Sequence, residues 1–239
     1  MASVCKLPIA LQILAMVDEH KLNLDAPLKV SPHDVTTNVS EVGAHWPQRK
    51  IYPLADLLAL MVAKSDNTAV ETLYRLAGGG PAITARLRAW TIDGIRIDRS
   101  KRQCNRDSSG PTPEARYAAL RRLMDDPRDT ASPDATVKLL SRTFRGASTA
   151  RIVEIMESTT TSPARIRGLL PPGTPVAHKT GTAGTAGRLN AATNDVGVVT
   201  LPGRAGRLAL AFYVKGSTLE LPERERIIAR LALSPFEQR

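Results

Sequence analysis

The chain has 239 residues, of which 42% are apolar and 23% are charged. This balance suits one large globular domain or two small ones, and it excludes a collagen, a disordered tail and a small disulfide scaffold. Basic residues outnumber acidic ones by 33 to 23, so the net charge is +10. The longest apolar run, Leu7–Val17, is too short for a bilayer, which takes about 20 residues, so no membrane attachment is expected. Cys5 and Cys104 allow one disulfide at most and lack metal-ligand spacing with histidine, so neither metal nor cofactor is expected.

The excess charge lies in the middle of the chain. Between Arg86 and Arg151 there are 15 basic and 8 acidic residues, a net charge of +7. A basic surface of this kind could bind nucleic acid. The chain lacks a zinc-finger pattern, however, and its 3 Phe, 4 Tyr and 2 Trp offer few rings on which bases could stack. A solvated arginine-rich face is the favoured interpretation, and a nucleic-acid-binding protein is the alternative.

The N-terminal stretch is apolar. Leu7–Val17 predicts a buried helix, with Pro8 in its first turn, where no backbone N–H is needed. No basic segment followed by a cleavage site precedes this helix, so no signal peptide is expected in the chain. Residues 18–53 are mixed and carry several proline turn signals, among them Ser31-Pro32 and Trp46-Pro47.

The middle of the chain is predominantly helical. The spacing of apolar residues predicts helices over 54–62, 68–76, 81–90, 113–125, 132–145 and 149–158. Thr112-Pro113 and Ser132-Pro133 are typical of helix starts, because the hydroxyl can cap the helix and proline suits its first turn. The polar stretch 95–113 is predicted to be a long loop.

In the last third of the chain, the sequence pattern changes from that of helices to that of β-strands. Runs of β-branched residues separated by turns predict antiparallel strands over 176–180, 195–201 and 208–214, followed by an amphipathic helix over 222–233. The expected fold is therefore mixed α/β, of the α+β type, with a helical lobe packed against an antiparallel sheet and a C-terminal helix. We expect a single domain over 1–239, mostly helical to about residue 170 and with the sheet and terminal helix from about residue 174.

Three short motifs occur in order along the chain: Ser3-Val-Cys-Lys6, Ser65-Asp66-Asn67 and Lys179-Thr180-Gly181. Each is weak alone, because a serine at a helix start is usually a cap and the other two are typical of turns and strand ends. Together, in this order and on these elements, they match the combined signature of serine β-lactamases and penicillin-binding proteins.

The first motif places a nucleophile beside a base. Ser3 and Lys6 lie one helical turn apart, so their side chains share a face at the start of the helix. A serine hydroxyl is a poor nucleophile until a base removes its proton, and a lysine amine can do this when burial or nearby cations lower its pKa. The unpaired amides of the helix N-terminus stabilise the developing anion.

The other two motifs would surround a substrate. Ser65 would shuttle a proton, and Asn67 would hold the substrate through its side-chain amide. Within Lys179-Thr180-Gly181, the lysine and threonine would offer a cation and a hydroxyl to a substrate carboxylate. The backbone amides of Ser3 and Thr182 are the natural oxyanion pair.

From Ser3 to about Phe236 the chain resembles the class A β-lactamases. Beyond the motifs, the similar stretches are Ala63–Ala69, Asp126–Pro133, Thr159–Pro163, Gly168–Gly181 and Ala192–Gly197. The resemblance implies hydrolysis of a β-lactam ring through an acyl-enzyme on Ser3, with Lys6 as its partner and the other motif residues around the substrate. It further implies a small-molecule β-lactam as substrate and a location in the periplasm or outside the cell. Separately, we expect a monomer without a nucleic-acid partner.

One departure concerns the loop that releases the acyl group. The family pattern Asp-Arg-x-Glu-x-x-Leu-Asn corresponds here to Asp98-Arg-Ser-Lys101-Arg-Gln-Cys104-Asn105. Lys101 replaces the glutamate that activates the deacylating water, whereas Asn105, which helps to hold that water, is kept. Loss of a general base slows the step that it serves by roughly 10²–10⁴-fold. We therefore expect an enzyme that acylates Ser3 but deacylates slowly.

Lys101 also reverses the local charge. Two cations roughly 4 Å apart repel by about 4 kcal/mol at an effective dielectric of about 20, so a nearby Lys101 would favour a neutral Lys6. Glu114, in the extra segment that follows, is a further candidate base. The alternatives to a β-lactamase are a penicillin-binding-protein-like acyl trap and a decayed pseudoenzyme.

A second departure concerns the start. The class A β-lactamases that the chain resembles have a helix and two strands ahead of the nucleophile, usually preceded by an export signal. In this chain the nucleophile is already residue 3, Ser3. Two alternatives follow: either the start is truncated or wrongly assigned, or the sheet lacks two strands and has an unpaired edge.

Overall fold

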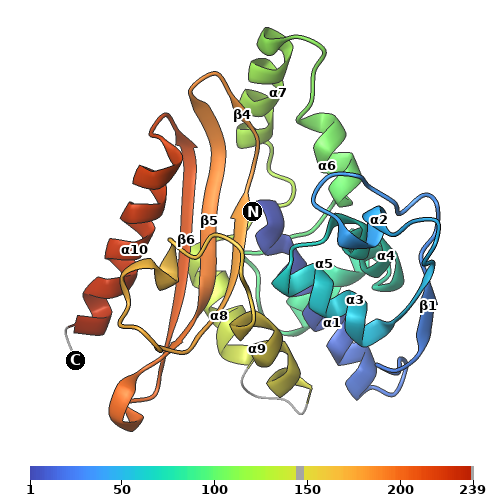
Figure 1. Cartoon of the computed structure of the whole chain (residues 1–239), viewed down its shortest axis with the longest axis horizontal. Helices are drawn as coiled ribbons and strands as arrows, with labels where there is room; N and C mark the ends of the chain where they lie inside the picture. The colour runs from blue at the N-terminus through green and yellow to red at the C-terminus, as the bar shows by residue number, and fades with distance from the viewer. Residues whose placement is uncertain (144–147, 238–239) are drawn as a thin grey trace.

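A four-stranded antiparallel sheet divides the helices into two groups in the computed structural model, which describes residues 1–143 and 148–237 (Figure 1). The strands are β3 (Val176–Thr182), β4 (Thr185–Ala186), β5 (Leu189–Thr200) and β6 (Arg207–Ser217). Each of the other three pairs with β5, and among the described strands β6 pairs with β5 alone. α10 (Leu221–Glu237) and the short 3-10 helix η2 (Ile166–Leu169) cover one face, and most of the other helices lie on the opposite side. This is the mixed arrangement that the sequence predicts.

The two faces of the sheet belong to two apolar cores, as the two-residue period of a strand requires. Val196 and Val198 on β5 face the helical lobe and join its large core. Val199, the residue after Val198, faces α10 and packs with Ile228 and Ala232. The prediction of three strands missed β4 and the first half of β5, because Leu189–Asn194 lacks the β-branched run that marks the rest.

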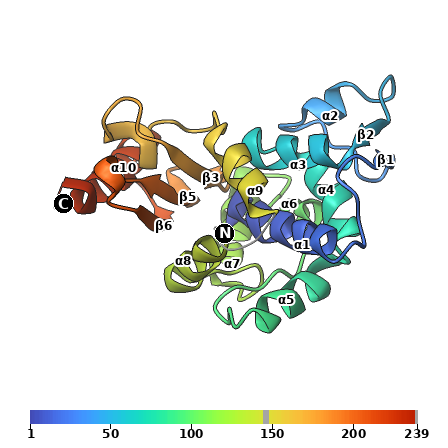
Figure 2. The ribbon, with the colours of Figure 1, turned by 90° about the horizontal axis from the view of Figure 1, so that it is seen from below.

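α1 (Lys6–Asp18) runs through the middle of the helical lobe, directly after the 3-10 helix η1 (Ala2–Cys5) (Figure 2). Its first nine residues are buried, as expected for a stretch without a polar face. The helices packed around it are α3 (Leu54–Ala63), α4 (Asn67–Leu76), α5 (Gly79–Ala89) and α9 (Thr149–Glu157). α8 (Pro133–Arg142) packs on β6, and the last residues of the predicted helix 132–145 lie outside those described.

Residues 18–53 form a small subsheet rather than only turns. β1 (Pro27–Lys29) pairs antiparallel with β2 (Ile51–Pro53), and α2 (Glu41–Ala44) lies between them in the chain. Three-residue strands are too short for a two-residue alternation to stand out in the sequence.

The prediction of a loop over 95–113 is wrong in part, because α6 (Lys101–Asp107) lies within it. α6 has no buried residue and therefore no apolar periodicity. Its start is fixed by a capping box, in which the Ser100 hydroxyl accepts from Gln103 N and the Gln103 side chain accepts from Ser100 N. α7 (Pro113–Asp125) follows at its predicted position, with Thr112 as the cap. We call residues 99–129, which include both helices, the 99–129 arm.

Within the described residues, no helix has the length and apolar character needed to cross a membrane. Cys5 and Cys104 are both free thiols. In the same part of the chain, no three His, Cys, Asp or Glu side chains are grouped so that they could hold a metal ion.

Candidate active site

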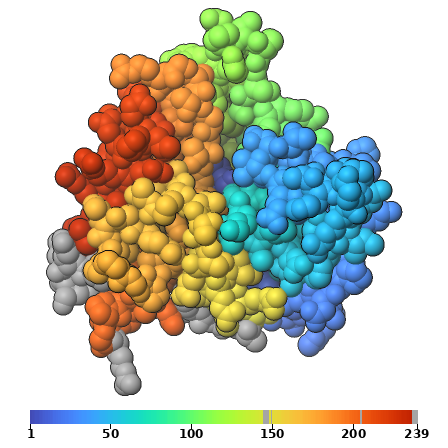
Figure 3. Space-filling view, in the orientation of Figure 1, coloured from blue at the N-terminus to red at the C-terminus, as the bar shows by residue number. Residues whose placement is uncertain are grey.

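The nucleophile segment lies against the edge of the sheet, where the helical lobe meets β3. A Cβ on Gly181 would come within 3.1 Å of Ser3 N and 2.9 Å of Met1 O, so only glycine lets β3 approach η1 this closely. Asn194, on the neighbouring β5, also donates its side-chain amide to Met1 O at 2.9 Å. Figure 3 shows dark blue atoms of the N-terminal segment in the seam between the orange strands and the blue and cyan helices.

Lys6 joins the first two motifs. Its side chain is completely buried, and its Nζ donates to Ser65 Oγ at 3.1 Å, to Ser65 O at 2.5 Å and to Asn67 Oδ1 at 2.9 Å. Ser65 turns the chain between α3 and α4 with a left-handed φ of 58°, which directs both of its oxygens at the amine. The structure records no hydrogen bond of the Ser3 hydroxyl with any described residue. Such bonds often form only once substrate is bound.

Lys179 brings the third motif to the same hydroxyl. Its Nζ, also buried, donates to Ser65 Oγ at 3.1 Å and to Thr180 O at 2.9 Å. One serine hydroxyl therefore accepts from two amines that lie 173 residues apart in the sequence. The structure thus brings together Ser3, Lys6, Ser65, Asn67, Lys179 and the Thr180–Thr182 edge.

Burial determines the charges of the two lysines. Burial lowers the pKa of Lys6 well below its usual value, and the Lys179 and Lys101 cations lower it further. Burial also lowers the pKa of Lys179, to about 8. The Asp195 carboxylate acts in the opposite direction and raises this pKa. These shifts favour an uncharged amine on Lys6, which is the form that can accept a proton.

Arg165 is a residue of the site that the sequence analysis missed. Its guanidinium is buried and donates to Thr182 Oγ1 at 2.7 Å, to Asn194 O at 2.8 Å and to Glu225 Oε1 at 3.1 Å. It thus supports the end of β3 from behind and leaves a positive charge beside it. A lone arginine 14 residues before Lys179 carries no sequence signal, so only the fold could reveal it.

Asp66, the middle residue of its motif, has a structural part in the site. Its carboxylate caps α4 by accepting from Ala69 N at 2.8 Å, and it also accepts from Val42 N and from the Ser40 hydroxyl, both at 3.0 Å. It therefore ties α2 to the turn that presents Ser65.

His178 pairs with Asp195 behind β3, with Nδ1 3.0 Å from Oδ2, and both side chains are buried. The imidazole therefore has a buried carboxylate partner behind the strand. Thr180 has its own partner, since its hydroxyl lies 2.6 Å from that of Thr161.

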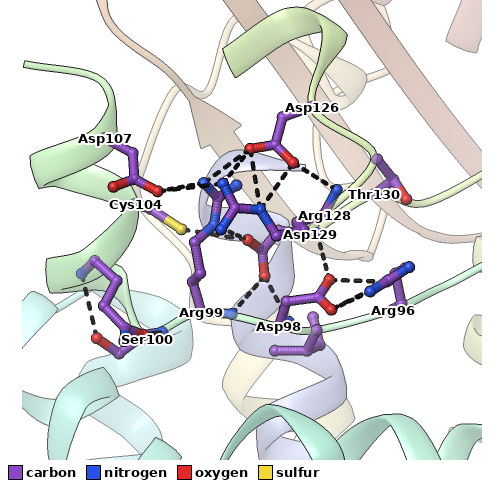
Figure 4. Close-up of polar contacts among 12 residues, drawn as sticks. Arg96, Asp98, Arg99, Ser100, Cys104, Asp107, Asp126, Arg128, Asp129 and Thr130 are labelled. Carbon is purple, nitrogen blue, oxygen red and sulfur yellow. Dashed lines mark hydrogen bonds and ion pairs between the residues drawn. The ribbon is translucent and has the colours of Figure 1, made fainter. Parts of the chain in front are cut away.

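The neck of the 99–129 arm is closed by a buried arginine (Figure 4). Arg99 Nε lies 2.6 Å from Asp129 Oδ2, and its Nη1 reaches Asp107 at 2.6 Å and Asp126 at 3.1 Å. Asp129 also accepts from the backbone amides of Asp98 and Arg99, at 2.8 and 3.0 Å. These contacts fix the start of α6.

Lys101 opens α6 and is half-buried, with no hydrogen bond or ion pair to the described residues. The next amide, Arg102 N, donates to the buried Glu71 of α4 at 2.6 Å, which holds α6 against α4. Asn105 follows one turn after Lys101, half-buried. Glu114 is exposed in the first turn of α7, and among the described residues nothing connects it to Lys6.

The comparisons with known proteins agree with this geometry. The profile of the "Beta-lactamase enzyme family" matches residues 1–236. Beta-lactamase VEB-1 of Pseudomonas aeruginosa is 32% identical over 97% of this chain and 75% of its own length. Extended-spectrum beta-lactamase PER-1 of the same organism is 33% identical over 99% and 74%. The crystal structure of a beta-lactamase from Chitinophaga pinensis superposes with a TM-score of 0.87 at 30% identity, covering 100% of this chain and 84% of that one.

A solved ancestral class A beta-lactamase superposes as well, with a TM-score of 0.83 at 29% identity. The chain belongs to the class A β-lactamase family. Lys101 stands where the loop pattern that the sequence resembles has a glutamate.

Proposed function

We propose that this protein opens the β-lactam ring through an acyl-enzyme on Ser3 and releases the product slowly. The observation that carries the proposal is the Ser65 hydroxyl, which accepts hydrogen bonds from both Lys6 and Lys179 at 3.1 Å. This arrangement joins a depressed-pKa amine, a proton carrier and a cation beside the nucleophile, as serine acyl transfer requires.

In acylation, the neutral Lys6 amine accepts the proton of Ser3 as its oxygen attacks the lactam carbonyl carbon. The carbonyl oxygen, now negative, accepts hydrogen bonds from the backbone amides of Ser3 and Thr182. The C–N bond of the ring then breaks, and the nitrogen takes a proton from Ser65, which Lys6 resupplies. Lys179 and Thr180, with Arg165 behind them, attract the substrate carboxylate, and Asn67 orients the substrate.

In deacylation, a water molecule must lose a proton as it attacks the ester on Ser3. A carboxylate at position 101 would accept that proton, but a lysine ammonium cannot. Asn105 remains to orient the water. Deacylation therefore becomes the slow step, and the acyl-enzyme accumulates.

Intact-protein mass spectrometry tests this proposal. After brief exposure to a penicillin, we expect the mass of one opened penicillin on the wild-type chain and none on Ser3→Ala. We expect Lys101→Glu to shorten the lifetime of the adduct by about 10²-fold or more. An unmodified Ser3 would contradict the acylation proposal, whereas an adduct that persists in Lys101→Glu would contradict only the assignment of the defect to Lys101.

A penicillin-binding-protein-like acyl trap is the second candidate, and Lys101 is the observation that favours it. Turnover of a chromogenic cephalosporin separates the two, since a trap stops after one equivalent. A decayed pseudoenzyme would form no adduct at all. A nucleic-acid-binding role is less favoured, because Arg96, Arg99 and Arg128 of the basic middle region pair with aspartates.

We propose further that residues 1–239 act as one domain, with the site between its helical part and its sheet. We propose a monomer without a nucleic-acid partner that meets its substrate in the periplasm or outside the cell, as the family resemblance implies. Gel filtration and salt-dependent DNA retention test the first two points, and fractionation of the source cells tests the third.

A further inference from the structure

The 99–129 arm carries two helices that share an anchor. Arg99 contacts Asp107 at the end of α6 and Asp126 just after α7, in addition to Asp129 at the neck (Figure 4). A shift of α7 is therefore transmitted to the helix that begins with Lys101. In Figure 1, α7 extends from the neck towards the end of the sheet that carries β4.

α7 buries an apolar face against this end of the sheet. Leu120 is only 2% exposed and packs with Ala186 of β4 and Ala191 of β5. Leu123 and Met124 from α7 pack around the same cluster. The arginines of α7 are exposed: Arg116, Arg121 and Arg122. α7 is thus docked on the sheet through one face and solvated on the other.

The docked face touches the connection that directly follows the Thr182 amide. A Cβ on Gly184 would lie 3.3 Å from Leu120 Cδ2, so the leucine rests against the Gly184 backbone. Ala183 belongs to the apolar cluster around Leu120, and its amide donates to Ala192 O at 2.9 Å. The Thr182 amide is therefore placed between Gly181, which touches Ser3, and a segment held by α7.

We propose that Leu120 is a positioning residue for the oxyanion site. By holding the Ala183–Gly184 connection it keeps the Thr182 amide opposite Ser3, and through α7 it links this amide to the arm that carries Lys101. The inference rests on the proposed function, in which the Thr182 amide binds the oxyanion. A misplacement of about 1 Å at a reacting group can slow a reaction by about 10²-fold, so a loss of packing here is measurable.

Three variants of the full chain test the proposal. Leu120→Ala removes the contact with Gly184, and Leu120→Met restores an apolar side chain of similar volume. Arg121→Ala, at the neighbouring exposed position of α7, is the matched control. Two quantities are measured for each: the rate at which a penicillin acylates Ser3, by quenched-flow mass spectrometry, and amide hydrogen exchange along the chain.

We expect Leu120→Ala to slow acylation about tenfold, while the other two variants stay within about twofold of wild type. We expect exchange in Leu120→Ala to rise over 181–187 and over α6 but not in α3. Faster exchange throughout the chain, or unchanged exchange over 181–187, would overturn the proposal and leave Leu120 a stability residue. The exchange result stands even where wild type forms no adduct, so it separates failure of this inference from failure of the proposed function.

Discussion

The Ser65 hydroxyl accepts hydrogen bonds from two buried lysine side chains, Lys6 and Lys179. Two full positive charges beside one hydroxyl in a dry site repel each other, and burial penalises both. From the sequence, burial and nearby cations, Lys101 among them, are expected to favour a neutral Lys6. In the structure burial is the largest cause, Lys179 the second, and Lys101 a smaller one. A site with Lys6 as base is therefore available whether or not position 101 is charged.

The part of the lowered Lys6 pKa that is due to Lys101 can be measured. Because its cation lowers the pKa of Lys6, Lys101→Met should raise that pKa. Acylation needs the neutral amine, so the acid limb of its pH profile should move to higher pH. Stopped-flow acylation by a chromogenic cephalosporin between pH 5 and 9 measures the shift.

Lys138→Met is the matched control for this shift, since Lys138 is an exposed lysine on α8. Its profile should overlay that of wild type. An identical acid limb in Lys101→Met and wild type would show that Lys101 does not act on Lys6.

At the scale of elements, the helices that could be predicted from the sequence are those whose buried face gives a periodic pattern of apolar residues. The buried α1 and the amphipathic α7 and α10 lie close to their predicted positions, because apolar side chains must recur on the face that packs. α6 was missed because it buries nothing and is held by polar contacts: the Ser100 cap, Arg99 and the Glu71 carboxylate. The Ser100–Gln103 capping box is a local pattern that the sequence analysis did not use, whereas Glu71 lies 31 residues from Arg102 and leaves no local pattern.

The same distinction applies to the site. The three motifs were found because their spacing is local, yet the Ser65 hydroxyl as their meeting point depends on a left-handed φ and on packing across the two lobes. Arg165 and Thr161 were missed because each acts on β3 from a segment without a motif.

The neck of the 99–129 arm yields a prediction about stability. Asp129→Asn leaves the buried Arg99 guanidinium without one of its two shortest carboxylate contacts and weakens two backbone hydrogen bonds. Breaking a buried pair on one side destabilises strongly, and since Asp107 and Asp126 remain, we expect a loss of about 2–4 kcal/mol in the free energy of unfolding. Urea denaturation monitored by circular dichroism measures it.

Asp93→Asn is the control for the neck, because Asp93 is exposed and lies 3.6 Å from Arg88. An exposed pair is worth about 0–1 kcal/mol, so this variant should unfold much like wild type. Equal losses in the two variants would mean that the neck contributes no more than a surface pair.

At the scale of the whole molecule, the site lies between the helical lobe and the sheet, and basic side chains meet there. Lys6 comes from the helical lobe, Lys179 from β3 and Arg165 from the segment before η2, and all three are buried. Carboxylates balance them only in part, through Asp195 near Lys179 and Glu225 beside Arg165. Basic side chains are thus in excess at the interface between the two lobes, where the burial of a charged group opposes folding.

This opposition makes stability depend on pH in a definite direction. The pKa of Lys179 is about 8 in the folded protein and 10.5 as a free side chain. Between these values the unfolded chain binds more protons than the folded one, so the free energy of unfolding must rise with pH across this window. The shift corresponds to roughly 3 kcal/mol, gained from about pH 8 to about pH 10.5 and absent below pH 8.

Lys179→Met should lose this rise, because methionine does not titrate. The difference in unfolding free energy between wild type and Lys179→Met should therefore move in favour of wild type as the pH increases from 8 to 10. Urea denaturation at pH 7, 8, 9 and 10 measures it, with Lys138→Met as the exposed-lysine control whose curve should run parallel to wild type. Parallel curves for wild type and Lys179→Met would mean that Lys179 keeps its ordinary pKa. In that case the Lys179 ammonium is solvated in the folded protein, and the Ser65 hydroxyl accepts its hydrogen bond from a permanently charged lysine.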